Sequence, residues 1–191
     1  MKKSKITKED KINWWNGTLF EEDVVELAIS KAYRDLMRTI HGFASNRNNV
    51  VIKTNAKESI KKYIDVVVKC NSMNQDLFDK LHKEQCYKLI QIFGEQKFTI
   101  GQAQKWINMT FKNLHLLEYS NIDTVYEFCH IPVDSYILCV TQYKKLNSSW
   151  SKLNYYDDYL EYQKWFREEY KDEIPLDVEF RLWLAEVKNR K

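Results

Sequence analysis

One lysine and one aspartate in this chain are of residue types that can do covalent and acid–base chemistry. Lys105 lies in the helix-like segment 101–112, and Asp134 follows 29 positions later, directly after Pro132-Val133. A lysine amine can attack a sugar carbon and form a Schiff base once it is deprotonated, and burial in a cleft lowers its pKa. A carboxylate beside it stabilises the positive charge that builds on a sugar when an N-glycosidic bond breaks. Lys105 and Asp134 are therefore the first candidates for reactive residues in this chain.

Each of these residues also has a plainer interpretation. A lysine on a helix usually faces solvent, and Asp134 stands where the N-cap of a following helix would stand. The two roles of Asp134 are compatible, because a helix N-terminus keeps a capping carboxylate ionised. The catalytic hypothesis requires that both side chains reach one concavity that is wide enough for a nucleoside.

The elements that position this pair are predicted to be helices. The chain has 191 residues with only 4 Gly and 2 Pro, against 6 Trp, 12 Tyr and 9 Phe. A sheet protein with many tight turns needs more Gly and Pro, so an all-β fold is excluded. A Gly-rich phosphate cradle is also excluded, because no two glycines lie within five residues of each other. We predict one all-α domain over residues 1–191, built as two lobes.

Apolar residues recur at helical spacing along most of the chain. Residues 1–11 are expected to form a basic tail, and Val50-Val51-Ile52 is a candidate short strand. The predicted helices are 20–42, 56–69, 75–92, 100–118, 137–146, 155–170 and 176–188.

The region of about 75–118, read as helix, hairpin and helix, resembles the helix–hairpin–helix DNA glycosylase superfamily. The residues that carry the resemblance are Thr99-Ile100-Gly101, Lys105 and Pro132-Val133-Asp134, and it covers about residues 75–146. The spacer between Lys105 and Asp134 is most similar to that of the archaeal 8-oxoguanine DNA glycosylase class. The resemblance implies a two-lobed helical fold with the active site in the cleft, and excision of a damaged or modified base. It also implies that Lys105 is the nucleophile, which would give lyase activity, and that Asp134 stabilises the sugar cation.

The resemblance also implies how DNA is held. The hairpin and the helix after it would contact the nucleic acid through Gly101, Gln102 and Lys112, because amide groups at a helix N-terminus bind phosphate. The flipped base would enter a pocket lined by Met109, Glu179 and Trp183.

The last two of these residues come from the C-terminal helix. Glu179 and Trp183 are four residues apart and thus share a helical face. The archaeal class likewise uses an acidic and an aromatic residue near its C-terminus. Core packing of Trp183 and a surface position of Glu179 are the plainer interpretations.

The charge distribution favours DNA as a partner of the first part of the chain. Residues 1–112 carry 20 Lys/Arg and 13 Asp/Glu, whereas residues 113–191 carry 10 and 14, and the net charge is +3. Solvated helix faces would give the same excess. The alternative function is a non-catalytic helical module that binds nucleic acid or a protein partner, for example in phage–host defence. A hydrolase of free nucleotides ranks lower, because the sequence holds no metal constellation.

No cofactor, metal or membrane is expected. The cysteines Cys70, Cys86, Cys129 and Cys139 lack zinc or iron–sulfur spacing, so we expect reduced thiols and a soluble, cytoplasmic protein. The four histidines show no triad or metal pattern, and His130 is expected to pack inside the fold. The run Tyr155–Tyr159 is expected to form a solvated helix face with aromatic packing.

Overall fold

The computed structural model describes residues 23–143, 145–146 and 149–190, and within these ranges the chain is all helical, with no strand. The predicted all-α fold class is confirmed, while the predicted basic tail 1–11 lies outside the described residues. The helices are α2 (Val24–Leu36), α3 (Asn49–Val68), α4 (Gln75–Phe93), α5 (Ile100–Leu116), α6 (Ser135–Thr141), α7 (Tyr156–Glu169) and α8 (Pro175–Asn189).

Five short 3₁₀ turns complete the described fold. They are η1 (Met37–Thr39), η2 (Phe43–Ser45), η3 (Ser120–Thr124), η4 (Tyr126–Phe128) and η5 (Trp150–Lys152).

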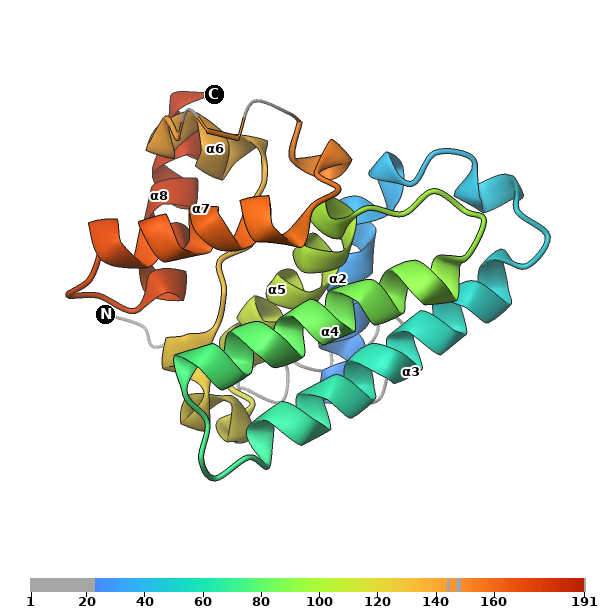
Figure 1. The fold of residues 1–191 in the computed structure, drawn as a ribbon, viewed down its shortest axis with the longest axis horizontal. Coiled ribbons are helices and arrows are strands. Elements are labelled where there is room, and N and C mark those ends of the chain that lie inside the picture. The colour runs from blue at the N-terminus through green and yellow to red at the C-terminus, as the bar shows by residue number, and fades with distance from the viewer. Residues whose placement is uncertain (1–22, 144, 147–148, 191) are drawn as a thin grey trace, which may run out of the picture.

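Helix α5 is the centre of the arrangement (Figure 1). Helices α2, α3 and α4 lie on one side of it, with α3 and α4 side by side, and α6, α7 and α8 gather on the other side. Fourteen of the 17 residues of α5 are buried, so its polar residues are enclosed as well as its apolar ones. The sequence predicted a one-sided apolar stripe, and the burial extends well beyond that stripe.

The seam between α2 and α5 joins apolar packing to side-chain hydrogen bonds. Trp106 is fully buried, and its indole N–H donates to the carbonyl of Ile29 at 3.0 Å. Asn113 donates to the carbonyl of Ala28 at 3.1 Å, one residue earlier on α2. These bonds fix how α2 lies along α5, and thereby fix which residues of α2 face the same space as α5.

Most predicted helices are confirmed, and three of their boundaries are corrected. The predicted helix 20–42 begins at Val24, after its N-cap Asp23, and ends at Leu36, where the 3₁₀ turn η1 follows. Residues 50–52 are not a strand, because α3 begins at Asn49 and includes them. Val50 and Val51 are 65% and 60% exposed, and the described residues contain no strand that could pair with them and favour extended backbone. Helix α6 ends at Thr141, five residues before the predicted end, because Gln142 adopts a left-handed φ of 50°.

Gly101 is required by close packing in the first turn of α5. A side chain at this position would overlap the carbonyl oxygen of Trp150 in η5. The amide of Gly101 donates to Leu153 at 3.0 Å, and the hydroxyl of Thr99 donates to the carbonyl of Ser151 at 2.9 Å. The helix N-terminus is therefore closed by η5.

We predict that Gly101→Ala destabilises the protein by about 1–3 kcal/mol, the usual cost of overpacking a closed site. In an open helix the same change would stabilise by up to about 1 kcal/mol, so the expected sign is reversed. Thermal unfolding measures the effect. Gly42→Ala is the comparison. No atom lies close to a side chain at that position, so only the φ of 74° would disfavour the alanine. A gain in stability for Gly101→Ala would contradict the packing described here.

Candidate catalytic cavity

A cavity of about 510 Å³ opens beside α5, between α2 and α8. It collects six of the eight residues that the sequence singled out, because its lining includes Lys105, Met109, Lys112, Asp134, Glu179 and Trp183. The other lining residues are Lys31, Arg34, Asp35, Arg38, Asn113, Leu116, Ser135, Tyr136, Trp150 and Phe180.

Lys105 and Asp134 form an ion pair on the wall of this cavity. The Nζ atom of Lys105 lies 2.8 Å from Oδ2 of Asp134, and the two side chains are only 7% and 11% exposed. Asp134 is also the N-cap of α6, where Oδ1 accepts the amides of Tyr136 and Ile137 at 2.9 and 3.0 Å. One carboxylate thus caps a helix with one oxygen and binds the lysine with the other. Both interpretations of Asp134, as a cap and as a cavity residue, hold together.

A second ion pair lies two helical turns along α5. Nζ of Lys112 is 2.5 Å from Oε2 of Glu179, which is 1% exposed. Burial raises the pKa of Glu179, although the positive charges of Lys112 and Lys105 act against that rise. Glu179 is therefore not the surface residue of the plainer interpretation. It is a buried carboxyl that shares a cavity with two lysines.

Aromatic side chains surround the second ion pair. Nζ of Lys112 lies 5.0 Å from the ring centre of Phe180 and 5.7 Å from that of Trp183. Trp183 in turn packs against Tyr136, with 5.6 Å between ring centres. Trp183 is partly buried and lines the cavity, so it is not a core residue alone. The cavity thereby offers flat apolar walls beside buried charge, a combination that suits an aromatic ligand with polar edges.

Gly101 and Gln102 do not reach this cavity or the surface, contrary to the predicted role in phosphate contact. Gly101 is buried under η5, as described above. Gln102 is 3% exposed, its side-chain nitrogen donates to the carbonyl of Thr39 at 2.6 Å, and its amide donates to Thr99. The first turn of α5 uses its donors inside the chain, through a capping box and the contact with η5. Of the three predicted nucleic-acid contacts, only Lys112 faces the cavity.

An extended, buried segment, Cys129–Asp134, delivers Asp134 to the cavity. It has no neighbouring strand, and two glutamines supply the backbone partners that a strand would supply. Gln104 of α5 donates to the carbonyl of Val133 at 2.9 Å and accepts its amide at 3.1 Å. Gln163 of α7 pairs in the same way with Ile131, at 2.9 and 3.0 Å. The position of Asp134 therefore depends on two side chains from two different helices.

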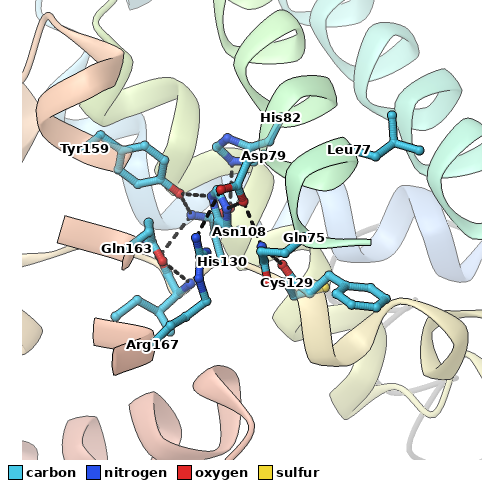
Figure 2. Close-up of polar contacts among 12 residues, drawn as sticks. Gln75, Leu77, Asp79, His82, Asn108, Cys129, His130, Tyr159, Gln163 and Arg167 are labelled. Atoms are coloured by element: carbon cyan, nitrogen blue, oxygen red, sulfur yellow. Dashed lines mark hydrogen bonds and ion pairs between the residues drawn. The ribbon is translucent and has the colours of Figure 1, made fainter. Parts of the chain in front are cut away.

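Behind this segment lies a polar network that the sequence did not predict (Figure 2). His130 is 1% exposed, as expected for a packing histidine, but both of its ring nitrogens are bonded. Nε2 lies 2.7 Å from Oδ1 of Asp79, and Nδ1 lies 2.8 Å from the hydroxyl of Tyr159. Arg167 donates to the other oxygen of Asp79 at 3.0 Å. Asn108 joins Tyr159 to the carbonyl of Ile131, so the network continues into the extended segment.

The network keeps Asp79 ionised and His130 neutral near pH 7. Burial acts to raise the pKa of Asp79, but the hydrogen bonds from His130 and Gln75 and the positive charge of Arg167 lower that pKa to about 2. Burial lowers the pKa of His130, against the opposing effect of Asp79. We therefore assign the His130 proton to Nε2, which donates to Asp79, while Nδ1 accepts from Tyr159.

Sequence reasoning missed these network residues because their types are ordinary surface types. Tyr159 was assigned to a solvated helix face, yet it is fully buried, as is Tyr156 at 1% exposure. Tyr156 and Tyr159 are three residues apart in a helical segment, and this spacing could have predicted that they share a buried face. Gln104 and Gln163 carried no signal, because a glutamine that bonds backbone has no sequence pattern.

Metal-ligating groups and membrane-spanning helices are both absent from the described part of the chain. No group of three or more His, Cys, Asp or Glu residues there could hold a metal ion. None of the helices there combines the length and apolar content that crossing a bilayer requires.

We predict that Gln104→Leu destabilises the protein by about 3 kcal/mol. The change keeps the side-chain volume but leaves the buried amide and carbonyl of Val133 without partners, at about 1–3 kcal/mol for each group. Urea unfolding measures the loss. Gln91→Leu, at an exposed position of α4, is the control and should change stability little. Equal effects of the two changes would show that the Gln104 bonds do not matter.

We predict that Asp79 makes stability depend on pH in the acid range. Its folded pKa of about 2 lies below the ordinary value of 3.8, so its contribution is complete above about pH 4 and is lost as the pH falls towards 2. The shift corresponds to about 2 kcal/mol. The stability difference between the wild type and Asp79→Asn should therefore shrink over this range. Asp76→Asn, an exposed aspartate of the same helix, should show no such trend.

Comparison with protein-family models, with curated protein sequences and with solved structures found no match to this chain. The function of this protein is therefore inferred from the geometry and chemistry of the cavity.

Proposed function

We propose that this protein is a DNA glycosylase with lyase activity that excises a damaged or modified base. The observation that carries the proposal is the 2.8 Å ion pair between Lys105 and Asp134 on the wall of a cavity of about 510 Å³. Cavities of 300–1,000 Å³ accommodate ligands of nucleoside size. The two residues that were singled out for attack and for charge stabilisation thus share one ligand-sized space.

The chemistry follows from the two groups. In the proposed step, Asp134 takes a proton from the Lys105 ammonium across their 2.8 Å contact. The neutral amine then attacks C1′ of the nucleotide, the N-glycosidic bond breaks as the new C–N bond forms, and Asp134 passes its proton to the leaving base and is again a carboxylate. The base leaves with the bonding electrons and takes up a proton, and the lysine nitrogen loses one. Opening of the sugar ring then gives the Schiff base. Asp134 stabilises the positive charge on the sugar during bond cleavage, and it holds the amine in place beforehand.

The far end of the cavity supplies groups for holding a base. Lys112 donates hydrogen bonds and Glu179 accepts them, while Trp183 and Met109 offer apolar surface. The edge of a modified purine such as 8-oxoguanine carries both donors and acceptors. A base drawn into the cavity would therefore find partners for its edge at one end, while its sugar lies near Lys105 at the other.

A two-lobed helix–hairpin–helix architecture is part of the proposal. It is supported by the succession of α4, a turn over residues 94–99 and α5, and by the helices that lie on both sides of α5. One observation favours the alternative, a non-catalytic binding module. The amides of Gly101 and Gln102 donate to Leu153 and Thr99, so these two groups are not available for the phosphate contact typical of such a hairpin.

We predict that borohydride traps a covalent adduct between the protein and duplex DNA that carries 8-oxoguanine or an abasic site. Borohydride reduces the Schiff base to a stable amine, and gel electrophoresis detects the shifted band. Lys105→Ala should abolish the adduct, because it removes the nucleophile. Asp134→Asn should slow adduct formation by at least about tenfold, because the amide cannot supply the negative charge while it still caps α6.

Lys88→Ala is the matched control, since it removes an exposed lysine that does not line the cavity. It should form the adduct at the wild-type rate. Circular dichroism of each variant separates loss of the nucleophile from loss of the fold. The lysine mechanism is wrong if no modified duplex gives an adduct, or if Lys105→Ala gives as much adduct as the wild type. DNA binding that persists without any adduct would support the binding module.

A further inference from the structure

The cavity lining contains three acidic side chains, which are Asp35, Asp134 and Glu179. Two of them are held in ion pairs, because Oδ2 of Asp134 lies 2.8 Å from Nζ of Lys105 and Oε2 of Glu179 lies 2.5 Å from Nζ of Lys112. The other oxygen of Asp134 is engaged as well, since it accepts two amides of α6. Asp35 makes no hydrogen bond and no ion pair with any residue in the described part of the chain. It is therefore the carboxyl of this lining that is free to act on a ligand.

Asp35 and Asp134 approach the cavity from opposite sides of α5. Asp35 belongs to α2, whereas Asp134 precedes α6, and these two helices lie on the two sides of α5 (Figure 1). Asp35 is exposed and lines the cavity, so a ligand inside the cavity can reach it. A sugar bonded to Lys105 would therefore have Asp134 on one side and Asp35 on the other.

The charge of Lys105 reaches Asp35. The walls of the cavity shield the Asp35 carboxyl in part from water, which raises its pKa. Four cations act to lower that pKa, and in order of their effect they are Lys105, Lys31, Lys112 and Arg38. Because Lys105 has the largest opposing effect, the carboxyl lies within electrostatic reach of the nitrogen that would form the Schiff base. A carboxylate with a raised pKa also binds a proton more tightly, and is thus a stronger base than an ordinary aspartate.

The helix itself gains little from a negative charge at this position. Asp35 stands in the last turn of α2, where the helix dipole disfavours an anion. Lys31 lies four residues earlier, and a lysine that precedes an acid is the weaker order for a charged pair on a helix. A neutral side chain would stabilise α2 at least as well. The access of Asp35 to the cavity is therefore the property that a function has to explain.

We propose that Asp35 is the general base of the lyase step, and that it removes a proton from C2′ of the sugar once Lys105 is bonded to C1′. This inference rests on the proposed function for the Schiff base at Lys105. C2′ is two bonds from the lysine nitrogen, so a base for this proton must stand beside that nitrogen without being bonded to it. Asp134 already contacts the nitrogen and caps α6, and Asp35 is the carboxyl that remains.

The electrons and protons of this step balance within the site. The Asp35 carboxylate takes the proton from C2′, the electron pair of that bond forms a double bond between C1′ and C2′, and the positive nitrogen takes up the electrons of the Schiff base. The nitrogen then returns its pair to C1′, a double bond forms between C2′ and C3′, and the C3′–O bond breaks with its electrons on the departing phosphate. Water hydrolyses the remaining Schiff base, and Asp35 releases its proton to solvent.

Separate measurement of the two steps on one substrate tests this inference. The probe is a duplex with a single natural abasic site and a label at the 5′ end of the strand that carries it. Borohydride trapping reports formation of the Schiff base, and the shortened strand on a denaturing gel reports the lyase step. Asp35→Asn should trap at nearly the wild-type rate, because Lys105 and Asp134 are unchanged. Its strand cleavage should fall by about 100-fold, the lower end of what a general base contributes.

Two further readouts distinguish a base from a merely structural residue. Asp35→Glu keeps a carboxylate and should cleave at least about tenfold faster than Asp35→Asn. The ratio of cleavage to trapping in the wild type should fall as the pH is lowered through the pKa of Asp35, because only the ionised carboxyl accepts a proton. Asp35→Asn should lack this fall.

Asp65→Asn is the matched control. Asp65 is likewise an exposed aspartate in the last turn of a helix, here α3, and it lies outside the cavity lining. Both steps should keep their wild-type rates in this variant. Lys105→Ala gives the background of cleavage that does not pass through the enzyme-bound Schiff base, and melting temperatures show that each variant is folded.

The two assays separate this inference from the proposed function. If the wild type forms the adduct but Asp35→Asn cleaves as fast as Asp65→Asn, the role of Asp35 is wrong and the glycosylase stands. Equal losses of trapping and cleavage in Asp35→Asn would also contradict the inference, since the carboxyl would then act before the lyase step. If the wild type gives no adduct with any modified duplex, the proposed function and this inference both fail.

Discussion

The cavity depends on one constraint, which is that the extended segment Cys129–Asp134 is buried without a strand beside it. Buried amides and carbonyls must be bonded, and the helices beside this segment use most of their own backbone groups internally, so side chains bond it instead. Gln104 and Gln163 meet this need by pairing with both backbone groups of Val133 and of Ile131. The segment is thereby held in register between α5 and α7, and Asp134 at its end is placed within reach of Lys105.

The two buried ion pairs are better understood as positioning devices than as sources of stability. Taking two charges out of water costs several kcal/mol for each ion, and the attraction between them roughly offsets this cost. A pair of leucines would serve the core of α5 as well. Removing one partner alone would leave a buried, unpaired charge, so Lys105 and Asp134 constrain each other, as do Lys112 and Glu179. A cavity lined by such pairs is costly for a fold that makes no use of it.

The sequence predicted the helices and most of the cavity residues that it singled out, but not the buried hydrogen bonds that hold those residues in place. Periodicity located α4 and α5 to within a few residues, because apolar spacing is a local signal. Lys105, Asp134, Glu179 and Trp183 were found through a family resemblance, and the structure brings them to one cavity. Gly101 was misjudged, because a glycine needed for a phosphate contact and one needed for the approach of η5 are identical in sequence. Val50 and Val51 were misjudged because β-branched residues favour a strand only where a partner strand exists.

Helix α5 links the constraint to the cavity through its own geometry. Gln104 and Asn108 are four residues apart and share the face that bonds the extended segment. Lys105, Met109 and Lys112 lie on the next face, which is turned by about 100° and lines the cavity. Helix α5 therefore carries the amine of Lys105 and also helps to fix the carboxylate of Asp134. The distance between the two groups depends on the angle between two neighbouring faces of this one helix. A shift of α5 would carry Lys105 together with Gln104, which holds Val133 beside Asp134, while Gln163 of α7 holds the segment at Ile131. A reaction that needs two groups within hydrogen-bond reach of one sugar benefits from that arrangement, because small misplacements in such a site cost large factors in rate.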